Sequence, residues 1–377
     1  MNRTMLKIYC SRVKHAWLLL GILLVTGPLA AKTVRVYVNF EGLESFSDTG
    51  RAVTTDIIVI DPVTQKVVQT IKGIATPHGI TLSPDKKFLY ITSESEKVVA
   101  IVDQKTGEII KKVPLTGRPH TLVTTKDGLR SFVDIYEAPG ALDIIDSNSR
   151  AKVRSIPING PVYDSSMTPD GKYLVANTHK LGDIFKLFVI DVQTERPIWE
   201  VKFNSVTNNM AIEANPDGST HRIFMTRHGL RGFDVVDFAE RNIVAEIKLP
   251  ETEASRGSTT AGPATKEEVD RMVGKNVTQD HGIGITPDNK TFWIDNELDH
   301  AVYVYSLPEI KLLGHVPVGT RPNWMAISPD SKQVYILNTG DSTMSIIDAK
   351  TLKEVARMPI EHQPGQRLFK VDAFELP

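Results

Sequence analysis

The sequence repeats itself about every 42 residues, and this period constrains the fold more than any other feature. Two markers carry the repeat: a turn built on Pro-Asp or a close variant, and a β-branched run that closes with Asp or Ser. The turns lie at residues 83–85, 125–127, 168–170, 215–217, 286–288 and 328–330. The runs lie at residues 59–61, 101–103, 144–146, 189–191, 235–237, 303–306 and 346–348. Both series step by 42 to 47 residues with one longer step at the same place, which indicates a single array with one insertion.

Each repeat contains four short segments of strand-like character. In one unit they cover residues 78–82, 88–92, 98–102 and 108–113, with Pro, Asp and Gly between them. A four-stranded unit of this length is typical of a β-propeller blade. A single small sheet cannot bury both of its faces, whereas a ring of sheets packs face to face around an axis.

The number of markers predicts seven blades. The first unit, residues 34–72, lacks an innermost strand, while residues 368–375 form an alternating apolar stretch without partners of their own. We expect this C-terminal strand to complete the first blade and so remove an exposed sheet edge. The prediction is an all-β, seven-bladed propeller over residues 32–377, with an insertion at 250–279 between blades five and six.

The repeats resemble those of the YVTN family of β-propeller proteins. The resemblance is clearest at residues 334–348 and 88–103, and it extends over nearly all of the chain after residue 31. It implies a propeller scaffold that is used for binding and, in some relatives, for lactone or lyase chemistry. The resemblance therefore indicates a fold more sharply than a function.

The N-terminal segment has the pattern of an export signal. Arg3, Lys7, Arg12 and Lys14 precede an apolar run over residues 16–25, which is shorter than the ~20 residues that span a bilayer. We predict a signal peptide over residues 1–31, cleaved near Ala31, and hence a periplasmic or secreted protein. The alternative is an uncleaved membrane anchor.

Charge and cysteine content exclude several classes of function. Residues 32–377 carry 40 basic and 45 acidic side chains, a net charge of −5, so a nucleic acid is not an expected partner. The single cysteine, Cys10, lies in the predicted signal peptide. A thiolate zinc site or a Cys-x-x-Cys-His haem attachment is therefore not expected. No membrane span is predicted after residue 31.

Three histidines occupy equivalent positions where the chain enters an inner strand: His78, His120 and His281, in blades two, three and six. We expect them to face the mouth of the central channel. Imidazole groups there can bind a ligand or a metal ion, and the three are the metal candidates. The alternative is that Pro-His-Gly is a structural repeat element whose imidazole bonds to a neighbouring blade.

Further polar residues lie in loops that are predicted to share this face. The candidate ligand-binding residues are His78, His120, His281, Glu94, Arg227, Glu297 and Asn323. Imidazole and carboxylate groups together bind divalent cations or perform general acid–base catalysis. By contrast, the repeated Asp residues from Asp61 to Asp348 each precede a turn and are predicted to cap its backbone.

Two irregular segments should flank the same mouth. The insertion over residues 250–279 contains a capping-box pattern that predicts a short helix over 265–273, and it directly precedes His281. It is either a lid or docking element or a passive surface loop. The second segment is the loop over residues 41–51.

The sequence supports three functions. The first is an exported propeller that binds a small ligand, a cofactor or a periplasmic protein partner at the channel mouth. The second is an enzyme, such as a lyase or lactonase, or a protein that handles a porphyrin-like or metal cofactor, using the histidines with Glu94, Glu297 and Arg227. The third is an accessory of a periplasmic redox system. The sequence does not identify the cofactor.

Overall fold

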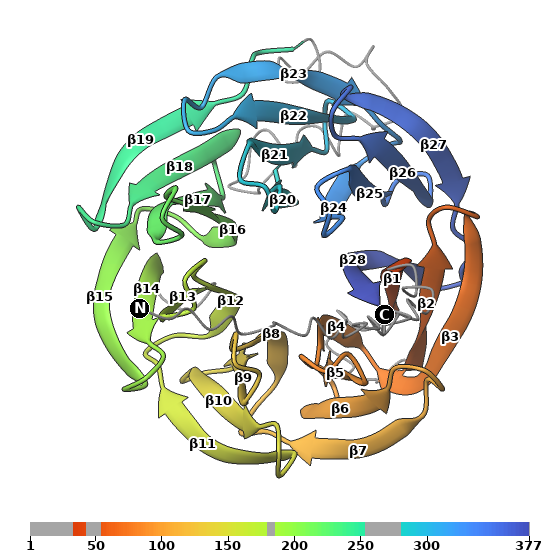
Figure 1. The fold of residues 1–377 in the computed structure, drawn as a ribbon, viewed down its shortest axis with the longest axis vertical. Coiled ribbons are helices and arrows are strands. Elements are labelled where there is room, and N and C mark those ends of the chain that lie inside the picture. The colour runs from red at the N-terminus through yellow and green to blue at the C-terminus, as the bar shows by residue number, and fades with distance from the viewer. Residues whose placement is uncertain (1–32, 43–53, 179–184, 253–279, 377) are drawn as a thin grey trace, which may run out of the picture. The chain divides into compact units, whose positions relative to one another are not determined.

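The computed structural model describes residues 33–42, 54–178, 185–252 and 280–376. Within them the chain forms seven four-stranded antiparallel sheets arranged in a ring around a central channel (Figure 1). The predicted seven-bladed, all-β propeller is confirmed. The predicted signal peptide, most of the loop over 41–51 and the predicted helix over 265–273 lie outside the described residues.

The blades follow one another along the chain, and each runs from an inner to an outer strand. Blade one contains β28 (Gln366–Leu376), β1 (Thr33–Gly42), β2 (Thr54–Asp61) and β3 (Lys66–Ala75). Blade two contains β4 (Pro77–Leu82), β5 (Phe88–Ser93), β6 (Val98–Asp103) and β7 (Ile109–Pro114). Blade three contains β8 (Pro119–Thr124), β9 (Arg130–Ile135), β10 (Ala141–Asp146) and β11 (Ala151–Pro157).

The remaining four blades repeat this order. Blade four contains β12 (Val162–Met167), β13 (Tyr173–Thr178), β14 (Phe185–Asp191) and β15 (Arg196–Phe203). Blade five contains β16 (Thr207–Ala214), β17 (Thr220–Arg227), β18 (Gly232–Asp237) and β19 (Asn242–Lys248). Blade six contains β20 (Ile283–Ile285), β21 (Thr291–Asn296), β22 (Ala301–Ser306) and β23 (Leu312–Pro317). Blade seven contains β24 (Pro322–Ile327), β25 (Gln333–Asn338), β26 (Thr343–Asp348) and β27 (Lys353–Pro359).

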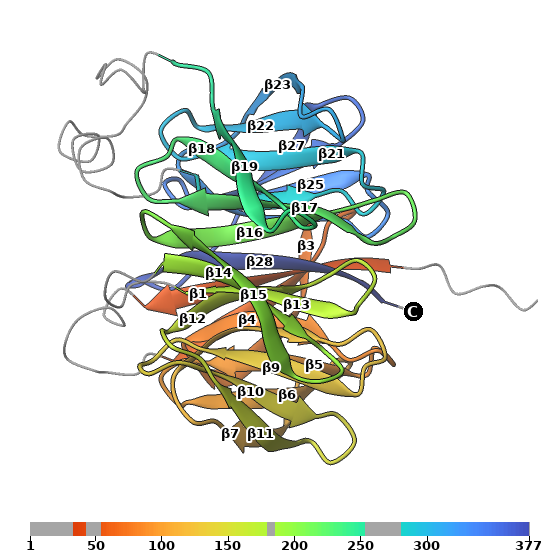
Figure 2. The ribbon, with the colours of Figure 1, turned by 90° about the vertical axis from the view of Figure 1, so that its left-hand side faces the viewer.

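The C-terminal strand closes the ring, as predicted. β28 pairs antiparallel with β1 from Thr33 opposite Leu376 to Gly42 opposite Gln366, with one register shift at Asn39/Phe40. The first and last segments of the propeller thus lie side by side (Figure 2). The described part of the chain has no helix long and apolar enough to cross a bilayer.

The hydrophobic core lies between blades rather than inside them. One buried cluster joins Ile57 and Val59 of blade one to Leu89 and Ile91 of blade two, and another joins blade seven to blade one through residues such as Leu368. Clusters of the same kind lie between the other neighbouring blades. The sheets are therefore stabilised mainly by the burial of apolar side chains against the next blade.

The aligned aspartates make the turn contacts that the sequence predicts. The Asp103 carboxylate accepts hydrogen bonds from the backbone N–H groups of Lys105 and Thr106 at 3.0 and 2.9 Å. In the Pro-Asp turn, the Ser83 hydroxyl donates to Asp85 at 2.7 Å. These hydrogen bonds satisfy backbone or hydroxyl groups at strand ends, which confirms a structural role for this set.

Ring closure gives a testable prediction. Leu368 of β28 is 1% exposed, so Leu368→Ala should lower the free energy of unfolding by about 2–5 kcal/mol, because it leaves a cavity between blades one and seven. Val355 of β27 is 58% exposed, so Val355→Ala should change it by less than about 0.5 kcal/mol. Urea unfolding followed by circular dichroism measures both. Equal changes in the two variants would contradict the inferred role of β28.

Candidate functional site

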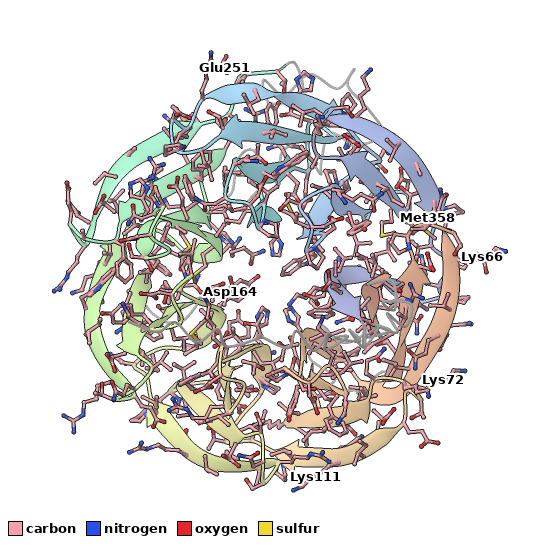
Figure 3. The ribbon with its side chains drawn as sticks, in the orientation of Figure 1. Lys66, Lys72, Lys111, Asp164, Glu251 and Met358 are labelled. Carbon is pink, nitrogen blue, oxygen red and sulfur yellow. The ribbon has the colours of Figure 1, made fainter. Side chains whose placement is uncertain are left out.

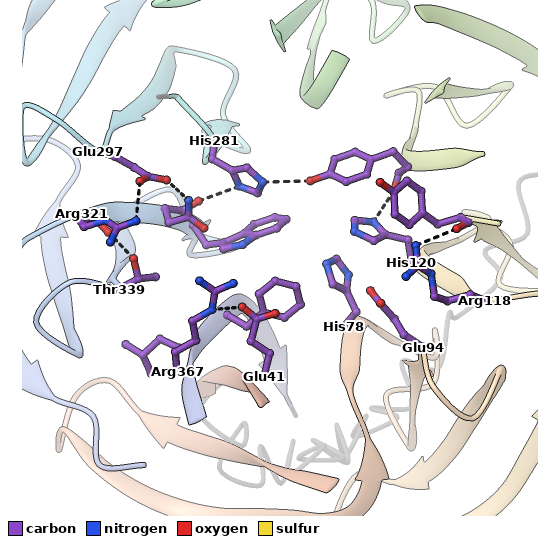
Figure 4. Close-up of a pocket in the computed structure, with 16 residues that line it drawn as sticks. Glu41, His78, Glu94, Arg118, His120, His281, Glu297, Arg321, Thr339 and Arg367 are labelled. Carbon is purple, nitrogen blue, oxygen red and sulfur yellow. Dashed lines mark hydrogen bonds and ion pairs between the residues drawn. The ribbon is translucent and has the colours of Figure 1, made fainter. Parts of the chain in front are cut away.

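A cavity of about 420 Å³ opens at one end of the central channel. Its residues come from the beginnings of inner strands, the ends of second strands and the closing strand β28 (Figure 4). The lining residues are Glu41, His78, Glu94, Arg118, His120, Tyr136, Tyr163, His281, Glu297, Arg321, Asn323, Trp324, Thr339, Arg367, Leu368 and Phe369. Many polar side chains project toward the channel, Asp164 among them, whereas Lys66, Lys72 and Lys111 lie on the outer surface of the ring (Figure 3).

Each cavity histidine is positioned by a side chain of another blade. Asn39 donates to the His78 carbonyl oxygen at 2.6 Å, Thr92 to the His120 carbonyl at 2.7 Å and Asn209 to the His281 carbonyl at 2.7 Å. Each of the three donors belongs to the blade before the histidine that it contacts. Asn39 and Thr92 lie in the second strands of their blades, whereas Asn209 lies in the inner strand β16, so two kinds of inter-blade contact hold the histidines.

His78 lies at the centre of the aromatic contacts in the cavity. Its ring is 3.7 Å from the His120 ring and 4.8 Å from the Phe369 ring, centroid to centroid. The residue is 1% exposed, and neither ring nitrogen makes a hydrogen bond. Burial, together with the nearby Lys370 ammonium, lowers the pKa of His78 well below its usual value, so the ring is neutral at pH 7.

The other two histidines have defined tautomers. The Nδ1–H of His120 donates to the Tyr163 carbonyl oxygen at 2.6 Å, and the Nδ1–H of His281 donates to the Asn323 carbonyl at 3.0 Å. A carbonyl oxygen only accepts, so each Nδ1 carries the proton and each Nε2 carries the lone pair. The Tyr163 hydroxyl donates to Nε2 of His281 at 3.1 Å. Burial lowers the pKa of His281 to about 4.

Three glutamates on the cavity wall have raised pKa values. Burial raises the pKa of Glu41 and of Glu94 to about 7, and it also raises the pKa of Glu297. Arginines oppose these shifts: Arg367 forms an ion pair with Glu41, and Arg321 lies 3.6 Å from Glu297. Near pH 7 the Glu41 and Glu94 carboxyl groups can therefore exchange protons with a ligand.

The arginines of this wall are the functional residues that sequence reasoning missed. Arg118 and Arg321 each stand directly before the proline that opens an inner strand, in blades three and seven. This Arg-Pro repetition is a signal that the sequence does contain. Arg367 reaches the cavity only because β28 pairs with β1, and no local pattern marks it.

Aromatic rings form much of the remaining wall. The His120 ring lies 4.3 Å from the Tyr163 ring and 5.2 Å from the Tyr136 ring, centroid to centroid. On another side, the Trp324 ring lies 4.6 Å from the His281 ring in an edge-to-face arrangement. The cavity thus combines flat apolar surfaces with a small number of polar and charged groups, which is typical of a small-molecule site.

Six of the seven candidate residues line this cavity: His78, His120, His281, Glu94, Glu297 and Asn323. Arg227 does not, because its guanidinium is bound to Asp234 and Glu246 within blade five, both at 2.6 Å. It lines a separate surface hollow instead. The proposed metal set also differs in the structure, where donor atoms of His78, His120 and Glu94 approach one another within 4.8 Å and His281 is not part of that group.

The fold and the site define a β-propeller with an imidazole-lined cavity at its channel mouth. The family model described as the cytochrome D1 heme domain matches residues 46–372. The chain therefore belongs to this family.

Several solved structures are similar to this chain. Hydrazine synthase of Kuenenia stuttgartiensis has 20% sequence identity and a TM-score of 0.63, covering 78% of this chain and 91% of that one. The dihydro-heme d1 dehydrogenase NirN, in complex with DHE, has 16% identity and a TM-score of 0.58, covering 86% of this chain and 64% of that one. A putative 6-phosphogluconolactonase of Bacteroides fragilis has 14% identity and a TM-score of 0.62, covering 92% and 99%. A comparison with curated proteins found no match. At these identities the structures support the fold alone.

The raised pKa of Glu94 predicts a pH-dependent stability. A carboxyl group that is protonated in the folded state stabilises the protein below its unfolded pKa, and this stabilisation is lost as the pH rises through about 7. In Glu94→Gln, the side chain at position 94 is neutral at every pH. From pH 5 to pH 8, the free energy of unfolding of this variant should therefore rise relative to wild type, by on the order of 1–3 kcal/mol.

Glu96→Gln is the matched control, measured by urea unfolding in metal-free buffer. Glu96 pairs with Lys112 at 2.7 Å and has a lowered pKa, so its substitution should give a constant difference between pH 5 and pH 8. Parallel pH profiles for Glu94→Gln and wild type would show that the Glu94 pKa is not raised.

Proposed function

We propose that this chain is a cofactor-binding propeller that holds a heme d1-type tetrapyrrole in the cavity at the channel mouth. The observation that carries the proposal is the cavity itself, in which imidazole, arginine and aromatic side chains of several blades converge. Membership of the cytochrome D1 heme domain family supports the choice of ligand class. The fold similarity to a dihydro-heme d1 dehydrogenase is consistent with it.

The donor set fits a group of this class. His281 would hold the iron of such a group through its imidazole. Its Nδ1–H is held by the Asn323 carbonyl, which leaves the Nε2 lone pair directed to the cavity side where Tyr163 now donates to it. The hydrogen bond from Nδ1–H, the nitrogen that does not bind the iron, would orient the imidazole and raise its basicity.

The remaining walls suit a flat ligand with acidic side chains. Arg118, Arg321 and Arg367 supply guanidinium groups, which form charge-assisted hydrogen bonds with carboxylates. Trp324 and Phe369 supply aromatic surface for the macrocycle. Cys10 is the only cysteine of the chain, so the arrangement of two thiols that attaches a c-type haem is absent and the ligand would be held without thioether bonds.

When bound, a tetrapyrrole iron supplies one-electron redox chemistry. The protein residues bind the acidic groups, exclude water from the ring and hold protons. Glu41 and Glu94 are suited to the last task because their pKa values are about 7. These two carboxyl groups favour a redox or enzymatic role as the second candidate function, alongside cofactor binding without turnover.

Three sequence-based inferences complete the proposal. We propose that the protein is exported to the periplasm or secreted, with cleavage near Ala31, and that its blades are of the YVTN type. Neither a signal peptide nor the repeat type follows from the family match, which covers residues 46–372. A tetrapyrrole or a periplasmic protein is the expected partner.

Absorption spectroscopy tests the proposal. Heme d1 and iron protoporphyrin IX, as a more accessible probe, should each bind the purified protein at one equivalent and shift the Soret band. His281→Ala should lose the absorption bands of imidazole-ligated iron, while His315→Ala, in the outer strand β23, should match wild type. If neither iron tetrapyrrole binds wild-type protein, the proposed function is wrong.

The arginines give a second prediction. Arg321→Gln should weaken the binding of iron protoporphyrin IX by about 10- to 100-fold, because a charge-assisted hydrogen bond contributes roughly 1.5–3 kcal/mol. The dimethyl ester of the same compound lacks carboxylates, so wild type and Arg321→Gln should bind it alike. Arg357→Gln, on the outer strand β27, is the control. An equal loss of affinity for acid and ester would show that Arg321 does not contact the acidic groups.

A further inference from the structure

We infer that His78, Glu94 and His120 form a binding site for one divalent first-row transition metal ion, in the cavity wall made by blades two and three. This goes beyond the proposed function, because the tetrapyrrole iron is assigned to His281 of blade six. His78 and Glu94 come from blade two, at the open end of the β4–β5 hairpin, and His120 is the second residue of the inner strand of blade three. In Figure 4 the three side chains lie together on one side of the cavity.

The spacing of the donor atoms fits a single ion. One ring nitrogen each of His78 and His120 and one carboxylate oxygen of Glu94 all lie within 4.8 Å of one another. An ion about 2.1 Å from each donor holds tetrahedral ligands ~3.4 Å apart. The donors therefore need to approach one another by at most about 1.4 Å. This requires the His78 ring to turn away from the His120 ring, whose centroid now lies 3.7 Å from its own.

His78 provides an independent indication of a ligand. It is 1% exposed, and both of its ring nitrogens are buried without a hydrogen-bond partner. A buried polar group without a hydrogen bond destabilises the folded state by roughly 1–3 kcal/mol, and such groups are rare in native proteins. Coordination of a metal ion by one of the two nitrogens provides that atom with a partner.

His120 has the outer-sphere contact that metal-binding histidines commonly have. Its Nδ1–H donates to the Tyr163 carbonyl oxygen at 2.6 Å, which leaves Nε2 as the ligating atom and fixes the ring plane. The ring also packs against two tyrosine rings, which contact each other. The imidazole is therefore held in one orientation before any ion arrives.

Glu94 supplies the anionic donor. Its backbone N–H donates to the Thr76 carbonyl at 3.1 Å, which anchors the loop that carries it. The neighbouring Arg118 guanidinium is directed to Tyr136, whose carbonyl it contacts at 3.2 Å and over whose ring it lies at 4.7 Å. Two imidazoles and one carboxylate select Zn²⁺, Fe²⁺ or Co²⁺ rather than Mg²⁺ or Ca²⁺, which prefer oxygen donors alone.

Three protein ligands leave at least one coordination position open. All three residues line the cavity, so that position faces the space in which a ligand binds. Sites of this composition bind water or a substrate group at the open position, whereas structural sites are closed by four protein ligands. The geometry points to a reactive or ligand-binding ion rather than to a structural one.

Titration with Co²⁺ tests the site, because its visible bands report the coordination geometry. Chelator-treated wild-type protein should bind one equivalent of Co²⁺ and develop bands of a four- or five-coordinate ion, which Zn²⁺ then displaces. His78→Ala and Glu94→Gln should each weaken binding more than tenfold. Glu96→Gln, two residues along the same turn, and His362→Ala, at an exposed position, should bind as wild type does.

Three results would overturn the inference: no stoichiometric binding by wild-type protein, wild-type affinity in Glu94→Gln, or equal losses in the two control variants. Circular dichroism and urea unfolding verify that each variant is folded, and Glu94→Gln keeps the inference falsifiable if His78→Ala does not fold. His281→Ala separates the two proposals, since it should lose imidazole ligation of the tetrapyrrole yet retain Co²⁺ binding. Loss of Co²⁺ binding in His281→Ala would overturn the ligand assignment, whereas failure of tetrapyrrole binding alone would overturn only the proposed function.

Discussion

The pairing of β28 with β1 is the constraint on which the rest of the structure depends. It joins the two ends of the propeller over the full length of β1 and gives blade one its inner strand. Without it, blades one and seven would each expose an apolar face, and β1 would present an unpaired edge. The same pairing brings Arg367 and Phe369 to the channel mouth, so the contact that closes the ring also completes the cavity wall.

Burial then sets the chemistry of the cavity. Polar side chains of one blade hold the inner-strand carbonyls of another, and this brings imidazoles and carboxyl groups together away from water. Desolvation favours the neutral form of each group, so it lowers the pKa of His78 and raises that of Glu94. Neutral imidazoles are the form that binds metal ions, and carboxyl groups with pKa values near 7 transfer protons readily. Burial therefore favours the imidazoles as metal ligands and Glu94 as a proton carrier, and Glu94 must release its proton before it binds an ion.

Much of the site could be anticipated because equivalent repeat positions share one face. His78, His120 and Asn323 each stand at the beginning of an inner strand, and in a propeller those positions point to the axis. Arg227 shows the limit of that reasoning. It lies at the end of a second strand, as Glu94 and Glu297 lie just after theirs, but the buried Asp234 on the adjacent strand binds its guanidinium and directs it within its own blade. The position of a residue in the repeat predicts which face of the propeller it lies on, whereas local ion pairs determine where its side chain points.

The sequence by itself determined the blade pitch, the number of blades, the identity of the closing strand and the turn role of the repeated aspartates. These properties follow from the strand periodicity and turn residues that each repeat contains within its own sequence. Only the tertiary structure decided which donors converge, because His78, Glu94 and His120 meet through the packing of two blades, and Arg367 arrives from the opposite end of the chain. Distances between blades depend on how apolar faces pack against each other, and no local sequence pattern encodes them.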